Sequence, residues 1–351
     1  MGTNLFDFGD PFARELWACI LPSAFVILFC TTLIPVLGSV PRPFRTFLTL
    51  EEAEAYEAAH EHDEGRPSDC ATLTESATST PRTVALSGLA LLQFVVWLGL
   101  GSYSFAIHAK TWDIIVPVVI AATWLYASLR PITWSSNTVF SDLFALYLAH
   151  IVTGFIVLGG SFFDHSVYQH PLPSQVVLAA RVLSLSVLII LLAIVLNMPL
   201  AVPSTRVNKD DVGKSVSPED YCTLWDWISF HWIVPLIEKG TYKTLNEDNV
   251  WKLSPTLSSR PLTSSFKDLD HAHIIWKLWT VNSGDMIWGF LLGFLSTVFT
   301  YAGPFFLQRI LAAIENPTPE NHATAYIYAF AAFFAALLEV RHQNCPHVIF
   351  H

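Results

Sequence analysis

The chain has 351 residues, of which 52% are hydrophobic and only 14% are charged, and its mean hydropathy is +0.45. This apolar content exceeds what a soluble domain of this length needs for its core, and it favours an integral membrane protein in a lipid bilayer. The formal net charge of −10 leaves no basic face for phosphates, which excludes nucleic acid as a partner. The five cysteines include no CxxC pair and indicate neither a zinc site nor a disulfide framework.

Seven apolar runs free of Asp, Glu, Lys and Arg stand out along the chain. A bilayer core requires roughly 20 predominantly apolar residues in a helix, and a charge at its centre costs about 3 kcal/mol. The runs are Leu16–Val40, Val84–Ala109, Ile114–Leu129, Leu143–Phe163, Val182–Pro203, Met286–Gln308 and His322–Leu338. Proline inside them is compatible with membrane helices. The sequence therefore predicts an all-α integral membrane protein with about seven transmembrane helices.

The distribution of Lys and Arg predicts the orientation, because basic residues accumulate on the cytosolic side of membranes. With the N-terminus outside, fifteen basic residues are cytosolic. The four others lie at outer ends of helices, at Arg14, Lys110, Arg181 and Arg309. We therefore expect a multi-pass protein with an extracellular or lumenal N-terminus.

Two stretches between the apolar runs are predicted to be cytosolic. The first, Pro41–Thr83, is acidic in its middle and rich in Ser and Thr at its end, and we interpret it as a flexible loop. His60 and His62 within it are interpreted as solvated residues, and Asp164, His165 and His170 lack a fourth metal ligand. No metal site is predicted.

The second stretch, Ser204–Asp285, contains an aromatic-rich apolar segment. Ser217-Pro218-Glu219-Asp220 predicts a helix start, with a serine cap, proline at the first position and acids in the first turn. The apolar residues that follow, up to Ile237, are too few to span a bilayer and too apolar to stay in water. They are expected at the membrane interface or packed on other helices. A juxtamembrane amphipathic helix without a specific partner is the alternative.

Three further features of the sequence bear on its chemistry. Gly213-Lys214-Ser215 imitates the end of a phosphate-binding loop, but Asn208 occupies the position of the first glycine. The chain alone is therefore not expected to hydrolyse ATP. Asp142 and His150 could belong to an ion path, since ionisable residues within membranes are often functional. A capping or snorkelling Asp142 and a neutral, hydrogen-bonded His150 are the alternative that we favour.

A family resemblance adds to this interpretation of the second stretch. The residues that carry it are Pro218-Glu219-Asp220, Ser229-Phe230, Trp232, Pro235-Leu236-Ile237, Gly240, Leu245, Asp248 and Trp251-Lys252-Leu253. This pattern resembles the lasso linker of subfamily C ABC transporters, the multidrug-resistance-associated proteins, in an order close to that of fungal members. In that family the lasso joins an extra five-helix N-terminal domain to the transporter core.

The resemblance implies a division of the chain. Residues 1–203 would form the five-helix membrane domain, 204–284 the lasso and an elbow helix at His271–Ser283, and 285–339 the first two core helices. Residues 340–351 would be an aberrant or truncated tail. The side chains implied to dock the lasso at an interface are Trp225, Trp227, Phe230, Trp232, Leu236 and Trp251. Those implied to line a substrate cavity of the core are Tyr301, Phe305, Phe306 and Gln308.

Two functions remain open on this basis. The resemblance implies the N-terminal part of an ATP-driven exporter of organic anions, conjugates or xenobiotics, truncated before its first nucleotide-binding domain. ATP and magnesium would then be cofactors of a full-length member only, and the partner would be the remaining transporter core, in the vacuolar or plasma membrane. The alternative is a stand-alone membrane interaction or regulatory module without transport activity. A seven-helix receptor is disfavoured by the long linker between spans five and six.

Overall fold

The computed structural model describes residues 11–33, 80–108, 110–133, 140–202, 211–246, 250–252, 263, 266, 273–316 and 318–344. In these ranges the regular structure is helical, and extended pairing is limited to isolated bridges. The chain divides into two compact units, of which the first holds the N-terminal helices and the linker and the second holds the two C-terminal helices. The predicted flexible loop Pro41–Thr83 lies outside the described residues up to Ser79.

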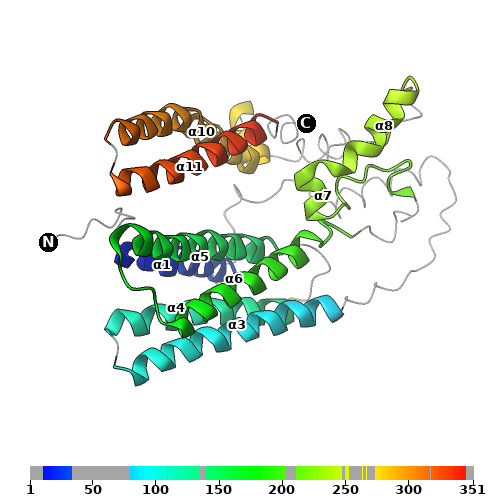
Figure 1. Ribbon diagram of the computed structural model, residues 1–351. Helices are drawn as coiled ribbons and strands as arrows, with labels where there is room; N and C mark the ends of the chain where they lie inside the picture. Colours follow the sequence, from blue (N-terminus) through cyan, green and yellow to red (C-terminus); the bar gives the residue numbers. More distant parts are fainter. Residues whose placement is uncertain are drawn as a thin grey trace. The chain divides into compact units, whose positions relative to one another are not determined.

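The first unit contains five long helices (Figure 1). They are α1 (Pro11–Leu33), α3 (Thr80–Ala106), α4 (Thr111–Thr133), α5 (Ser141–Tyr168) and α6 (Gln175–Leu196). Helices α3 and α4 lie side by side along their lengths. The turn between them places His108 at a φ of 52°, a left-handed conformation that reverses the chain within a few residues.

By length and hydropathy, four of these helices and one helix of the second unit are candidate membrane spans. In the described residues the candidates are Pro81–Ala106, Thr111–Thr133, Asp142–Tyr168, Gln175–Leu196 and Ser296–Glu315. Many large apolar side chains on α3, α5 and α6 are exposed, including Val95, Phe155 and Ile189. Such surfaces are costly in water and suit lipid. The all-α integral membrane fold is thus confirmed, whereas the count of seven and the orientation stay predictions.

The helices extend beyond the apolar runs that predicted them. Helix α6 begins at Gln175, seven residues before the predicted Val182. The reason is Arg181, which the run excluded because of its charge. Its guanidinium donates to the Glu15 carboxylate of α1 at 2.7 Å, so the charge is compensated inside the helical bundle. Pro22 and Pro117 lie inside α1 and α4, as expected for membrane helices.

Large side chains of α3, α4, α5 and α6 form the core of this unit. Trp124 and Tyr147 are almost fully buried, and their rings stack with centroids 5.9 Å apart. Leu86, Leu143 and Leu188 surround them. This packing joins α4 to α5 and places the polar residues described below.

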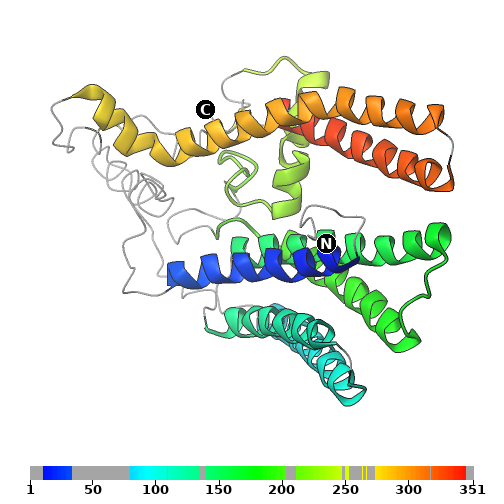
Figure 2. The same ribbon diagram turned by 90° about the vertical axis from the view of Figure 1, so that its left-hand side faces the viewer.

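Two antiparallel helices form most of the described part of the second unit, which also takes in residues 163–170 at the end of α5. Helix α10 (Ile274–Glu315) packs along α11 (Pro319–Asn344). The elbow predicted at His271–Ser283 is not a separate helix, because α10 is continuous through Ser283 and only bends in its N-terminal third (Figure 2). At about 1.5 Å per residue it is about twice as long as a bilayer core is thick. The predicted tail is also helical at its beginning, since α11 continues to Asn344.

Candidate functional site

The linker between the two sets of long helices folds differently from its predicted start. The helix start predicted at Ser217 is wrong, because Ser217–Cys222 forms a single turn in which Pro218 O accepts from the N–H groups of Tyr221 and Cys222. Helix α7 (Leu224–Ser229) begins later, where Thr223 Oγ1 accepts from Asp226 N at 3.1 Å and donates to Asp226 Oδ2 at 2.7 Å. The Thr-x-x-Asp spacing was the signal for this cap.

Main-chain contacts anchor the linker on the five-helix unit. Leu224 N donates to Met198 O and Leu200 N donates to Cys222 O, both at 3.0 Å, which forms a short antiparallel bridge just after α6. Leu224 is buried, and Ile228 packs against the bundle core. The apolar face of α7 is therefore held by the first unit itself.

The rest of the linker closes on itself. Phe230, at a φ of 55°, ends α7 and leads through η4 (His231–Ile233) into α8 (Val234–Tyr242). Trp251 Nε1 donates to Gly213 O at 2.9 Å, and the Trp251 ring lies 6.3 Å from that of Trp232. Residues far apart in sequence thus meet in one closed segment, which we call the lasso (residues 211–252).

The predicted docking side chains are unequally placed. The structure brings Trp232 and Trp251 together, and it leaves Trp227, Phe230 and Leu236 half-buried. Trp225 is 55% exposed on α7. Their docking at an interface remains a prediction.

In the turn that resembles a phosphate-binding loop, the backbone N–H groups donate to carbonyl groups of the same turn. Gly213 N donates to Val216 O, while Lys214, Ser215 and Val216 donate to Asp211 O. A phosphate-binding loop needs such groups free to cradle oxygens. This turn therefore lacks the geometry for phosphate.

Three of the residues implied to line a core cavity lie on one face of α10. Tyr301, Phe305 and Gln308 are spaced by four and three residues and are exposed on the α10–α11 pair. The Arg309 guanidinium lies 5.4 Å from the centre of the Phe305 ring. Phe306, which was also implied to line the cavity, instead stacks on Tyr328 of α11. The face with Tyr301 is thus available to further helices, and its role stays a prediction.

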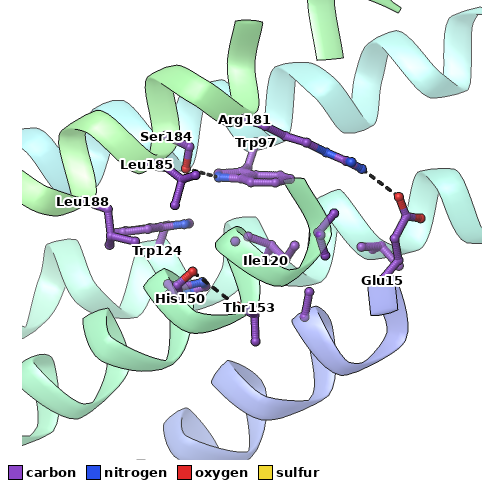
Figure 3. Close-up of a pocket in the computed structure, with 14 residues that line it drawn as sticks. Glu15, Trp97, Ile120, Trp124, His150, Thr153, Arg181, Ser184, Leu185 and Leu188 are labelled. Carbon is purple, nitrogen blue, oxygen red and sulfur yellow. Dashed lines mark hydrogen bonds and ion pairs between the residues drawn. The ribbon is translucent and has the colours of Figure 1, made fainter. Parts of the chain in front are cut away.

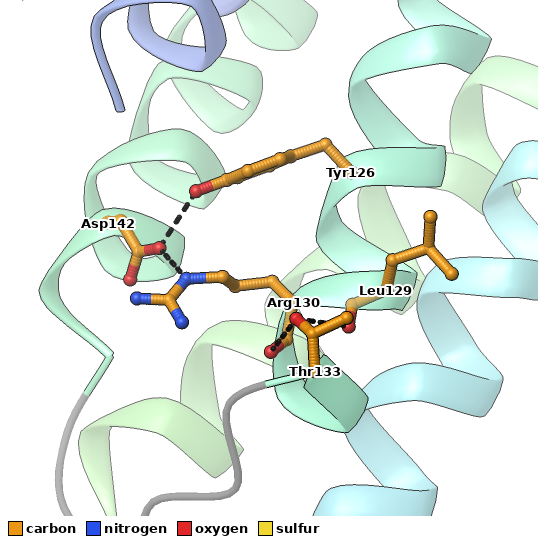
Figure 4. A network of polar contacts seen from close by, with 5 residues as sticks. All are labelled: Tyr126, Leu129, Arg130, Thr133 and Asp142. Carbon is orange, nitrogen blue, oxygen red and sulfur yellow. Dashed lines mark hydrogen bonds and ion pairs between the residues drawn. The ribbon is translucent and has the colours of Figure 1, made fainter. Parts of the chain in front are cut away.

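Asp142 lies in a buried ion pair (Figure 4). Its Oδ2 accepts from Arg130 Nε at 2.5 Å and from the Tyr126 hydroxyl at 2.9 Å. The Arg130 guanidinium also lies 5.7 Å from the centre of the Phe140 ring. Asp142 therefore joins the ends of α4 and α5 and does not snorkel.

His150 is hydrogen-bonded within the bundle, as expected. Its Nε2 lies 3.0 Å from Thr123 Oγ1, and that hydroxyl donates its proton to Ile120 O at 2.7 Å. With that proton committed to Ile120 O, the tautomer that satisfies Thr123 Oγ1 has its hydrogen on Nε2 and an acceptor at Nδ1. The imidazole stacks on Trp124 with centroids 4.8 Å apart. His150, Trp124, Glu15 and Arg181 line a small cavity (Figure 3).

Comparison with known proteins gives a distant relation. No family model matches the chain. An ABC-type transporter of Talaromyces islandicus, cctS, is 20% identical over 122 residues, covering 35% of this chain and 8% of that protein. The vacuolar heme ABC transmembrane exporter abc3 of Schizosaccharomyces pombe is 26% identical over 179 residues, covering 46% of this chain and 12% of the exporter. The chain thus spans about a tenth of the length of these relatives, and it is a multi-pass membrane protein related to fungal ABC transporters.

Proposed function

We propose that the chain is the N-terminal part of an ATP-driven exporter of subfamily C, the multidrug-resistance-associated proteins, which moves organic anions, conjugates or xenobiotics. Both transporters named above are much longer than this chain, and the one from Schizosaccharomyces pombe is an exporter. In this proposal the chain supplies the accessory five-helix domain, the lasso and the first two core helices. It lies in the vacuolar or plasma membrane.

The anchored lasso is the observation that carries the proposal. An ordinary linker needs no fixed structure, whereas this one bonds back to the end of α6 at Leu224 and closes through Trp251 and Gly213. It also leaves apolar side chains such as Trp225 and Ile237 exposed. A segment that is fixed on one side and apolar on the other is suited to couple the accessory domain to a transporter core.

The remaining parts of the reaction belong to domains outside this chain. ATP and Mg²⁺ would be bound by the nucleotide-binding domains of the full-length protein. Tyr301, Phe305 and Gln308 would line the substrate path once further core helices cover that face of α10. Trp225, Trp227, Phe230, Trp232, Leu236 and Trp251 would hold the lasso at the interface.

Transport by sealed vesicles tests the proposal. Inside-out vesicles from the source organism, with and without disruption of this gene, are given a fluorescent organic-anion conjugate with ATP or with a non-hydrolysable analogue. We expect ATP-dependent uptake that is lost on disruption and restored by the intact gene. Trp251→Ala should reduce the uptake, whereas Tyr242→Ala, at an 88% exposed residue of the same segment, should not. Equal uptake by disrupted and intact strains for all conjugates tried would contradict the proposal.

A further inference from the structure

The five-helix unit contains a partly open cavity to which all five long helices contribute. Its volume is about 60 Å³, several times the roughly 10–15 Å³ that one water molecule needs on the same measure. Glu15 and Arg181 lie at the end formed by α1 and α6, and Trp97, Trp124 and His150 lie deeper among α3, α4 and α5 (Figure 3). The space is therefore large enough for part of an organic molecule.

Trp124 presents a polar atom to this cavity without a partner. The side chain is only 1% exposed and lines the cavity, and its Nε1 donates to no acceptor among the described residues. The stacked His150 has its Nε2 engaged with Thr123, and its Nδ1 likewise has no hydrogen-bond partner in the part of the chain that the structure describes. A buried donor without an acceptor thus lies on one ring of the stacked pair, and the other ring carries a nitrogen that makes no hydrogen bond with the described residues. Buried polar groups are normally satisfied, so a missing ligand or water is indicated.

The other polar groups around the cavity are already engaged. Trp97 Nε1 donates to Ser184 Oγ at 3.2 Å, and Thr153 Oγ1 donates to Ala149 O at 2.8 Å. Glu15 and Arg181 pair at 2.7 Å, so their charges offset each other. The cavity therefore has no net charge to attract an ion, and the rest of its wall is mostly aliphatic.

We propose that this cavity binds an uncharged, lipid-soluble molecule through a single hydroxyl group. A hydroxyl both accepts and donates, so it can accept from Trp124 Nε1 and donate to His150 Nδ1. The apolar body of the ligand lies against Ile120, Leu185 and Leu188. A hydrocarbon would leave both ring atoms unsatisfied, and an ether would satisfy only the donor. This site is independent of the transport proposal, since it lies wholly in the first unit.

Photolabelling with an aliphatic alcohol tests the site. The purified chain in lipid nanodiscs is labelled with an octanol that carries a diazirine, and labelled peptides are identified by mass spectrometry. We expect saturable labelling of cavity-lining residues. At equal mole fraction in the lipid, 1-octanol should compete best, octyl methyl ether less well, and nonane least.

Two variants and a matched control separate the site from non-specific partition. Trp124→Phe keeps an aromatic ring and removes the donor, and it should weaken saturable labelling about fivefold. Trp112→Phe makes the same change on an exposed residue of α4 and should have no effect. Ala18→Leu adds volume to the wall without touching the polar pair, and it should abolish labelling. This variant tests the site even if Trp124→Phe fails to fold. Labelling that is not saturable, is spread over lipid-facing residues or is equal for the three competitors would overturn the proposal and leave only water in the cavity.

Discussion

Asp142 and Arg130, with side-chain exposures of 9% and 16%, form a more deeply buried ion pair than Glu15 and Arg181 do. Removal of one partner leaves the other charge without its neighbour in a poorly solvated place. We expect Asp142→Asn to lower the free energy of unfolding in detergent by about 3 kcal/mol. The loss of stability would be measured as a lower melting temperature, determined by size-exclusion chromatography of heated samples.

The second pair supplies the control. Glu15 and Arg181 have side-chain exposures of 34% and 18%, so solvent screens their attraction. We expect Glu15→Gln to cost less than about 1 kcal/mol. Equal losses for Asp142→Asn and Glu15→Gln would show that burial does not set the contribution of these pairs.

Cys222 of the lasso is expected to be chemically inert. Burial, together with the negative charge of Asp226, raises the pKa of its thiol from 9.0 to about 12. The thiolate is the reactive form, so alkylation by iodoacetamide at pH 8 should be at least about a hundredfold slower in the folded chain than in the unfolded one. Mass spectrometry of the Cys222 peptide over time gives both rates. Similar rates would mean that the lasso is open in solution.

Helix α7 depends on the cap formed by Thr223. Thr223→Val keeps the shape of the side chain and removes the oxygen that accepts from Asp226 N, a loss of about 1 kcal/mol. We expect faster hydrogen exchange of the amides of Leu224–Ser229 by a factor of about five. Thr241→Val, in the exposed last turn of α8, is the control and should leave α7 unchanged. Unchanged exchange in Thr223→Val would show that contacts with Met198 alone hold the helix.

The spans could be predicted from the sequence because apolar runs of bilayer length are a strong signal. Helix ends were less predictable, since Arg181 enters α6 only because Glu15 of another helix pairs with it. The same limit applies to the bundle cavity, because Trp124 and Ser184 look like ordinary residues of apolar helices until the fold brings them together. In the lasso, the acidic residues after Ser217 wrongly predicted a helix start there. The helix begins instead after the cap at Thr223, six residues later.

The predicted orientation, with the N-terminus outside, is tested at the two ends of α6. It places Leu172, between α5 and α6, outside and the lasso, which follows α6, inside. In a cysteine-free background, Leu172→Cys should react with a membrane-impermeant maleimide in intact cells. Lys243→Cys should react only after the membrane is permeabilised. The reverse pattern would invert the predicted orientation.

Long-read sequencing of the transcript across the codons for Glu339–His351 tests most directly whether this chain belongs to an exporter. We predict that the message continues into further core helices and into domains with a G-x-x-x-x-G-K-[ST] loop, as expected for a protein that binds ATP. A message that ends at His351 would contradict the assignment. The five-helix unit and its lasso would then form a module that binds a partner and transports nothing.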